Sequence, residues 1–142
     1  MALEEKTLPG DVIVAAELEE AIRAALVNDV VPCVAAFRIA AERQLAPLAV
    51  GQAADALGIH LGTCQLGLFG YPGHAKGWSK VAEQPVPEGL EAALLEAAGA
   101  PQQLACIQLW DLAERFGIPR LQIGFVTDKL GIKIRPCQLG AF

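Results

Sequence analysis

The sequence has four cysteines, whose thiols could bind a metal ion or respond to oxidation, and they form two pairs with the same spacing. Cys33 and Cys64 form one pair, and Cys106 and Cys137 form the other. Two thiolates from a pair, or all four together, are a ligand set for a tetrahedral metal ion or for a redox sensor. The members of a pair are 31 residues apart (64 − 33), whereas zinc fingers and ribbons use C-x-x-C pairs, which this sequence lacks. We therefore expect Cys33 and Cys106 to pack as small apolar residues, and metal or redox sensing is the third interpretation.

Other reactive residues do not form the patterns that catalysis needs. The sequence has no H-E-x-x-H motif, no paired-carboxylate motif and no recognisable Ser/His/Asp order. The two histidines, His60 and His74, have no counterpart in the repeat described below. The glycine-rich stretch 70–77 lacks the G-x-x-x-x-G-K-[ST] spacing of a phosphate-binding loop. We predict a non-enzymatic protein without a cofactor.

Composition and charge narrow the class of protein further. With 54% hydrophobic and 19% charged residues in 142, the chain has enough apolar side chains for a well-filled, mainly aliphatic core. The net charge is −5, and residues 74–142 carry seven basic and seven acidic side chains. Neither half is a general polyanion binder, although a local basic face on the second half stays open. The acidic first residues lack a signal-peptide core and no apolar run has the length of a bilayer span, so we expect a cytoplasmic protein with no membrane partner.

An internal duplication is the strongest pattern in the sequence. Residues 33–69 align without a gap with residues 106–142, and 13 of the 37 positions are identical. The stretch Cys64–Gly67, Cys-Gln-Leu-Gly, recurs as Cys137–Gly140. A helix-like apolar period precedes each copy, at 18–26 and 90–98. We predict a first repeat at 11–69, a linker at 70–86 and a second repeat at 87–142, packed as one compact domain about a pseudo-twofold axis.

Inside each repeat, a small residue is followed by a turn residue and then by a helix-opening proline. In the second copy Ala113 is followed four residues later by Gly117, and Pro119 opens the next helix. In the first copy Gln44 stands at the turn and Pro47 opens the helix. The pattern resembles the helix-turn-helix superfamily. The resemblance implies a mainly α fold of duplicated helix-turn-helix units. The duplication predicts an intramolecular pseudo-dimer, and the alternation at Ile132, Lys133 and Ile134 predicts a short β-strand after each unit. From the symmetry we also expect residues 59–65 and 132–138 to pair as an antiparallel ribbon.

The resemblance also implies a function, because the second helix of such a unit enters the major groove of DNA. The leading prediction is a helix-turn-helix-type regulatory protein that binds double-stranded DNA and acts in transcription. The polar and basic residues on or beside the second helix of the second copy are the candidate DNA contacts: Arg120, Gln122, Lys129, Lys133 and Arg135.

The residues shared by the two second helices favour a different function. Leu48 matches Leu121, and Gly51 matches Gly124, so each helix presents a leucine and a glycine one turn apart. Such a pair suits close packing against another protein segment better than contact with bases. We therefore expect these four residues to form a repeat-packing interface. The alternative function is a non-enzymatic adaptor that keeps the fold without binding DNA and meets a protein partner through apolar helix faces.

Overall fold

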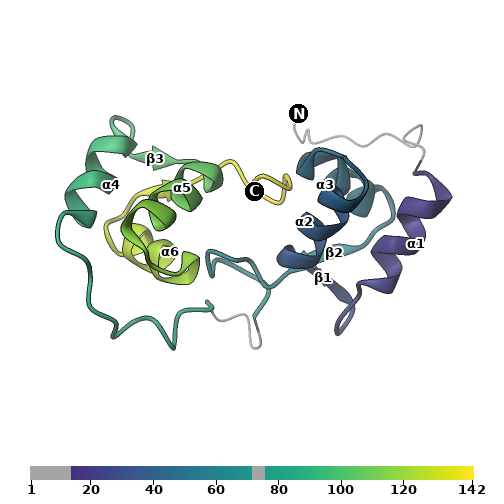
Figure 1. Ribbon diagram of the computed structural model, residues 1–142, viewed down its shortest axis with the longest axis horizontal. Coiled ribbons are helices and arrows are strands. Elements are labelled where there is room, and N and C mark those ends of the chain that lie inside the picture. Colours follow the sequence, from purple (N-terminus) through teal and green to yellow (C-terminus); the bar gives the residue numbers. More distant parts are fainter. Residues whose placement is uncertain (1–13, 72–75) are drawn as a thin grey trace. The chain divides into compact units, whose positions relative to one another are not determined.

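The computed structural model describes residues 14–71 and 76–142, and these residues form a mainly helical protein with six α-helices and four short strands. The chain divides into two compact units. Unit 1 comprises the chain up to Thr63 together with Leu139–Ala141, and unit 2 comprises Cys64–Gln138 together with Phe142. Figure 1 shows the elements of both units coloured along the sequence.

The described residues of unit 1 form three helices and a pair of strands. Its elements are α1 (Ala16–Ala24), β1 (Val30–Pro32), α2 (Cys33–Glu42), α3 (Pro47–Ala56) and β2 (His60–Gly62). Pro32 ends the strand and stands as the N-cap of α2, and Pro47 occupies the first turn of α3, where its missing N–H costs no helical hydrogen bond. The buried face of α2 contains several alanines, and these small side chains let α3 pack close against it.

Unit 2 repeats this order of elements. It contains α4 (Leu90–Ala98), β3 (Gln103–Leu104), α5 (Cys106–Phe116), α6 (Arg120–Lys129) and β4 (Lys133–Ile134). Its core is almost entirely aliphatic, as the composition predicted, and its fully buried leucines and isoleucine are Leu66, Leu90, Leu94, Leu104, Leu109 and Ile123.

A left-handed residue turns the chain between the two central helices of each unit. Gly117 has φ +67° after α5, and Gln44 has φ +57° after α2. In each unit the first residue after the turn donates its N–H back into the preceding helix: Ile118 to the Ala113 carbonyl (3.0 Å) and Leu45 to the Ala40 carbonyl (2.9 Å). Gln44 thus adopts the conformation that glycine adopts without steric cost, and the first turn has the geometry of the second.

The strands pair within each unit and not as the antiparallel ribbon that symmetry suggested. β1 pairs with β2 in parallel, with Val30 opposite His60, and β3 pairs with β4 in parallel, with Gln103 opposite Lys133. The ribbon prediction is therefore wrong. A strand before each central helix supplies the hydrogen-bonding partner, and two or three residues are too few to show the alternating pattern of a strand in a sequence.

The limits of the units differ from the predicted repeat boundaries at 69, 70–86 and 87. Unit 1 ends at Thr63 and unit 2 begins at Cys64, but residues Leu139–Ala141 again belong to unit 1. Residues 76–86 are not a free linker, because Trp78 and Val81 are buried in unit 2 at 9% and 8% exposure. The physical reason for the new boundary is the placement of the two Cys-Gln-Leu-Gly segments.

Candidate interaction surfaces

The first Cys-Gln-Leu-Gly segment packs on α6 in unit 2. The carbonyl oxygen of Leu66 lies so close to Gly124 that a Cβ there would overlap it. Gly67, at φ +86°, lies against the indole of Trp78, and Trp78 Nε1 donates a hydrogen bond to the Leu66 carbonyl (2.8 Å). We call the surface formed by Gly124 and Trp78, on which Leu66 and Gly67 pack, docking site 2. Only a glycine in α6 leaves room for a backbone carbonyl at this distance.

The Leu-Gly part of the second Cys-Gln-Leu-Gly segment, Leu139 and Gly140, packs on α3 in unit 1 in the same manner. The carbonyl oxygen of Leu139 occupies the position that a Cβ of Gly51 would take. Gly140, at φ +81°, lies against Leu48, with 2.8 Å between the Leu48 Cδ1 and the position of a Gly140 Cβ. We call the surface formed by Leu48 and Gly51, on which Leu139 and Gly140 pack, docking site 1.

Each docking site holds the Leu-Gly pair of one of the two Cys-Gln-Leu-Gly segments. Leu66, from the first repeat, fills the site on the helix of the second repeat, and Leu139, from the second repeat, fills the site on the helix of the first. The leucine–glycine pairs predicted as an interface, Leu48–Gly51 and Leu121–Gly124, therefore include two glycines that a Leu-Gly segment covers. Leu121 is half-buried. The signal in the sequence was the repeated segment together with a repeated glycine inside a helix.

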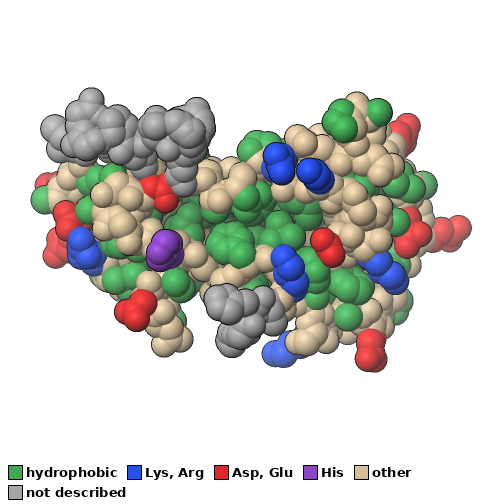
Figure 2. Space-filling view, turned by 180° about the vertical axis from the view of Figure 1, so that it is seen from behind, with side chains coloured by type: hydrophobic (Ala, Val, Ile, Leu, Met, Phe, Trp, Pro, Cys, Tyr) green, Lys and Arg blue, Asp and Glu red, His purple; other side chains and the backbone are tan. Residues whose placement is uncertain are grey.

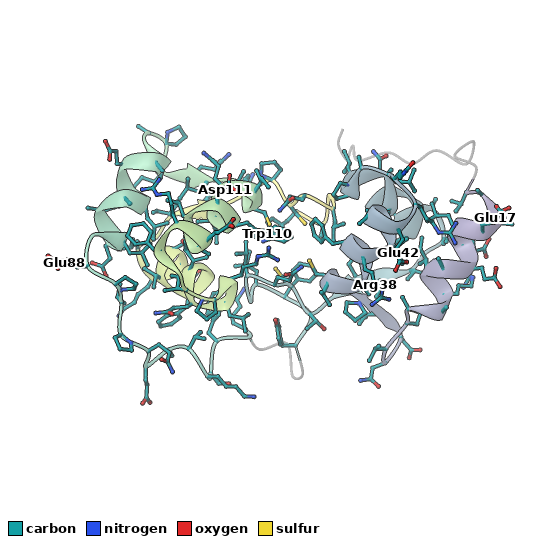
Figure 3. The ribbon with its side chains drawn as sticks, in the orientation of Figure 1. Glu17, Arg38, Glu42, Glu88, Trp110 and Asp111 are labelled. Atoms are coloured by element: carbon teal, nitrogen blue, oxygen red, sulfur yellow. The ribbon has the colours of Figure 1, made fainter. Side chains whose placement is uncertain are left out.

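Arg120, the first candidate DNA contact, is held by neighbouring side chains in unit 2. Its guanidinium carbon lies 3.6 Å from the centroid of the Trp110 ring, and its Nη1 donates a hydrogen bond to Oε1 of Gln65. A guanidinium stacked on an indole gains a cation–π attraction. These contacts fix Arg120 at the rim of a cleft of about 300 Å³ beside Trp110 and Asp111, which come from α5 (Figure 3).

The other four candidates divide into one buried and three exposed side chains. Gln122 is only 4% exposed, and its Nε2 donates to the Pro85 carbonyl (2.8 Å), so this amide stabilises unit 2 and does not reach a DNA surface. Lys129, Lys133 and Arg135 are exposed. On the face that Figure 2 draws, acidic and uncharged side chains lie among the basic ones.

Two of the three cysteines of unit 2, Cys64 and Cys106, are buried, and Cys137 is half-buried. Desolvation by burial raises the pKa of Cys106 to about 11, against a hydrogen bond from Gln138 Nε2 to its Sγ (3.3 Å), and the charge of Cys137 adds to the rise. Burial likewise raises the pKa of Cys64. Within residues 14–71 and 76–142, no three His, Cys, Asp or Glu side chains are arranged to hold a metal ion, although Cys33, Cys64, Cys106 and Cys137 were candidates.

We expect the raised pKa of Cys106 to make the protein less stable in alkali. Between pH 9, where an unfolded thiol ionises, and pH 11, where the native one does, the native state binds the proton more tightly than the unfolded state. The free energy of unfolding should therefore fall with rising pH, by up to about 1.4 kcal/mol per pH unit from this group. Urea unfolding at several pH values, compared between wild type and Cys106→Ala, measures the difference. Equal slopes for the two proteins would contradict the assignment.

Unit 1 carries an open groove of about 500 Å³. It lies on α1, α3 and the turn before α3, and its apolar lining comes from Val14, Leu18, Leu45, Ala49 and Ala53. Glu17, Arg43 and Gln52 supply its polar lining, and Figure 3 shows Glu17 projecting from α1. Neither periodicity nor the helix-turn-helix resemblance pointed to this groove, because it depends on how α1 packs against α3.

Comparison with known proteins adds no assignment: no family model, curated protein or solved structure matches the chain. Of the helices in the described residues, none has the length and apolar character needed to cross a bilayer.

Proposed function

We propose that the chain is a duplicated helix-turn-helix-like protein that binds other proteins, without catalysis and without reading DNA bases. The two repeats would form an intramolecular pseudo-dimer. The recurrence of strand, helix, turn, helix and strand about 73 residues apart supports the duplication, as does the left-handed residue at both turns, Gln44 and Gly117.

The observation that carries this proposal is the covering of both second helices. In a DNA-binding helix-turn-helix protein the exposed face of the second helix meets the base edges. Here the Leu66 carbonyl rests on Gly124 of α6, and the Leu139 carbonyl rests on Gly51 of α3. Arg120 is engaged by Trp110 and Gln65. With its glycine face filled by the protein's own backbone, each second helix offers base edges less free surface than an uncovered helix would.

DNA binding through phosphates alone is the second candidate function. Lys129, Lys133 and Arg135 are exposed at the end of α6 and around β4, and phosphate contacts need no helix in the groove. Such binding would be sequence-independent and would weaken steeply with salt, because it releases counterions.

The groove on unit 1 supports a partner of definite chemistry. A hollow of this size with aliphatic walls from α1 and α3 fits apolar side chains spaced one turn apart on a helix. Residues 14–63 carry six acidic and three basic side chains. The charged lining of the groove is balanced, with Glu17 and Arg43, so it is the acidic surroundings that favour an amphipathic helix whose apolar stripe is flanked by lysine or arginine.

The proposal is tested by fluorescence anisotropy with two labelled probes, a random DNA duplex and a helical peptide of leucine and lysine. We expect the peptide to bind, and Leu45→Asp to weaken its binding about tenfold or more by placing a charge in the apolar groove, which is roughly 1.4 kcal/mol or more. Leu95→Asp is the matched control, because Leu95 has nearly the same exposure (41%, against 38% for Leu45) and lies in α4 of unit 2. We expect no DNA binding at low salt.

Two results would count against the proposal. Equal effects of Leu45→Asp and Leu95→Asp, or equal binding of a leucine–glutamate peptide, would remove the groove as the docking surface. DNA binding that falls steeply with salt and is lost in Lys133→Glu and Arg135→Glu would establish the phosphate-binding alternative.

A further inference from the structure

We propose that two copies of this chain exchange halves, so that the docking sites of one copy are filled by the Cys-Gln-Leu-Gly segments of the other. The partner in this assembly is a second copy of the chain. The first half, residues 14–71, and the second half, residues 76–142, are the exchanged pieces.

Each half carries one docking helix and one segment that fits the other half. The first half contains Gly51 on α3 and the segment with Leu66, and the second half contains Gly124 on α6 and the segment with Leu139. Gly51 receives Leu139, and Gly124 receives Leu66. Each half therefore provides a docking site for the other half and a segment that fills the docking site of the other half. Neither half fills its own docking site.

These contacts are the same whether the two halves belong to one chain or to two. The Leu139 carbonyl on Gly51, the Leu66 carbonyl on Gly124 and the Gly140 contact with Leu48 each join a residue of one half to a residue of the other. An exchanged dimer keeps all of them, twice, and has the symmetric, reciprocal interface that closes an assembly at two copies.

Concentration therefore decides between the closed monomer and the exchanged dimer. Joining two pieces by a short connection gives an effective concentration on the order of 1 mM. We expect monomers at micromolar concentration and a dimer fraction that grows with concentration when the halves are allowed to separate and re-form.

Two single substitutions make the exchange visible. Gly51→Ala damages docking site 1 in the first half, and Gly124→Ala damages docking site 2 in the second half. A chain with either change has one damaged site. An exchanged dimer of the two variants pairs an unaltered first half with an unaltered second half, which restores one complete set of contacts. Two differently labelled copies of Gly51→Ala cannot restore one and are the matched control.

The experiment mixes donor-labelled and acceptor-labelled chains in denaturant, refolds them together at high concentration, and measures energy transfer and mass by light scattering. We expect the Gly51→Ala and Gly124→Ala mixture to give about tenfold more labelled dimer than the control mixture. Wild-type chains refolded together should give a dimer fraction that rises with concentration, and this measurement stands even where the variants fold poorly. Equal dimer in the two mixtures, or wild type that stays monomeric near 1 mM, would overturn the proposal.

Discussion

Replacing Gly124 by alanine should lower the free energy of unfolding by about 3 kcal/mol or more. The added Cβ would overlap the carbonyl oxygen of Leu66, a backbone atom that cannot rotate away as a side chain can. In the middle of an unobstructed helix the same change raises stability by about 1 kcal/mol, because alanine is the better helix former. The sign of the effect therefore reports whether the segment rests on α6, and urea unfolding followed by circular dichroism measures it.

Gly117→Ala is the matched control for that measurement. Gly117 lies in the same unit at φ +67°, and no atom lies within 4 Å of the Cβ that alanine would add. Its cost is therefore conformational only, about 1–2 kcal/mol for a left-handed residue. If Gly124→Ala costs no more than Gly117→Ala, the Leu66 carbonyl does not occupy the place assigned to it.

Replacing Trp78 by alanine should cost about 3–5 kcal/mol. The side chain is buried, its ring meets Phe125 edge-on with centroids 5.8 Å apart, and its Nε1 donates to the Leu66 carbonyl. Trp78→Phe keeps an aromatic ring and loses the donor, so it should cost about 1–3 kcal/mol. Denaturant unfolding measures both changes.

The comparison of the two Trp78 variants separates packing from hydrogen bonding. A loss confined to Trp78→Ala would assign the effect to the ring alone, and a loss shared by both variants would add the hydrogen bond to Leu66. If the free energy of unfolding of Trp78→Ala is within about 1 kcal/mol of that of wild type, residues 76–86 belong to a linker, as the prediction of a linker at 70–86 has it.

Local pattern predicted much of the helical framework. The helical spacing at 18–26 and 90–98 corresponds to α1 and α4, and Pro47 and Pro119 stand at the starts of α3 and α6. These features depend on neighbours within a few residues, which a sequence displays directly. The short strands before α2 and α5 were missed, since their pairing partners lie about 30 residues away.

The docking sites could be predicted only in part, because their components are far apart in the chain. Gly51 and Leu139 are 88 residues apart (139 − 51), and Leu66 and Gly124 are 58 apart (124 − 66). The sequence showed that both helix glycines and both Cys-Gln-Leu-Gly segments recur, but not which segment meets which helix. Gln122 was predicted to contact DNA as a polar residue on the second helix, but its side chain is buried. Residues on most sides of α6 are buried, including Gln122 and Thr127.

Residues Leu139–Ala141 belong to unit 1 but are synthesised after Cys64–Gln138 of unit 2, and this affects when unit 1 can be completed. A ribosome that has made Thr63 must add 76 more residues (139 − 63) before Leu139 exists. At about 5–20 residues per second this takes roughly 4–15 s, during which Gly51 of the nascent chain has no Leu139 to receive. Helices and loops form in microseconds. We therefore expect the helices of the first half to form several seconds before Leu139 is available to cover Gly51.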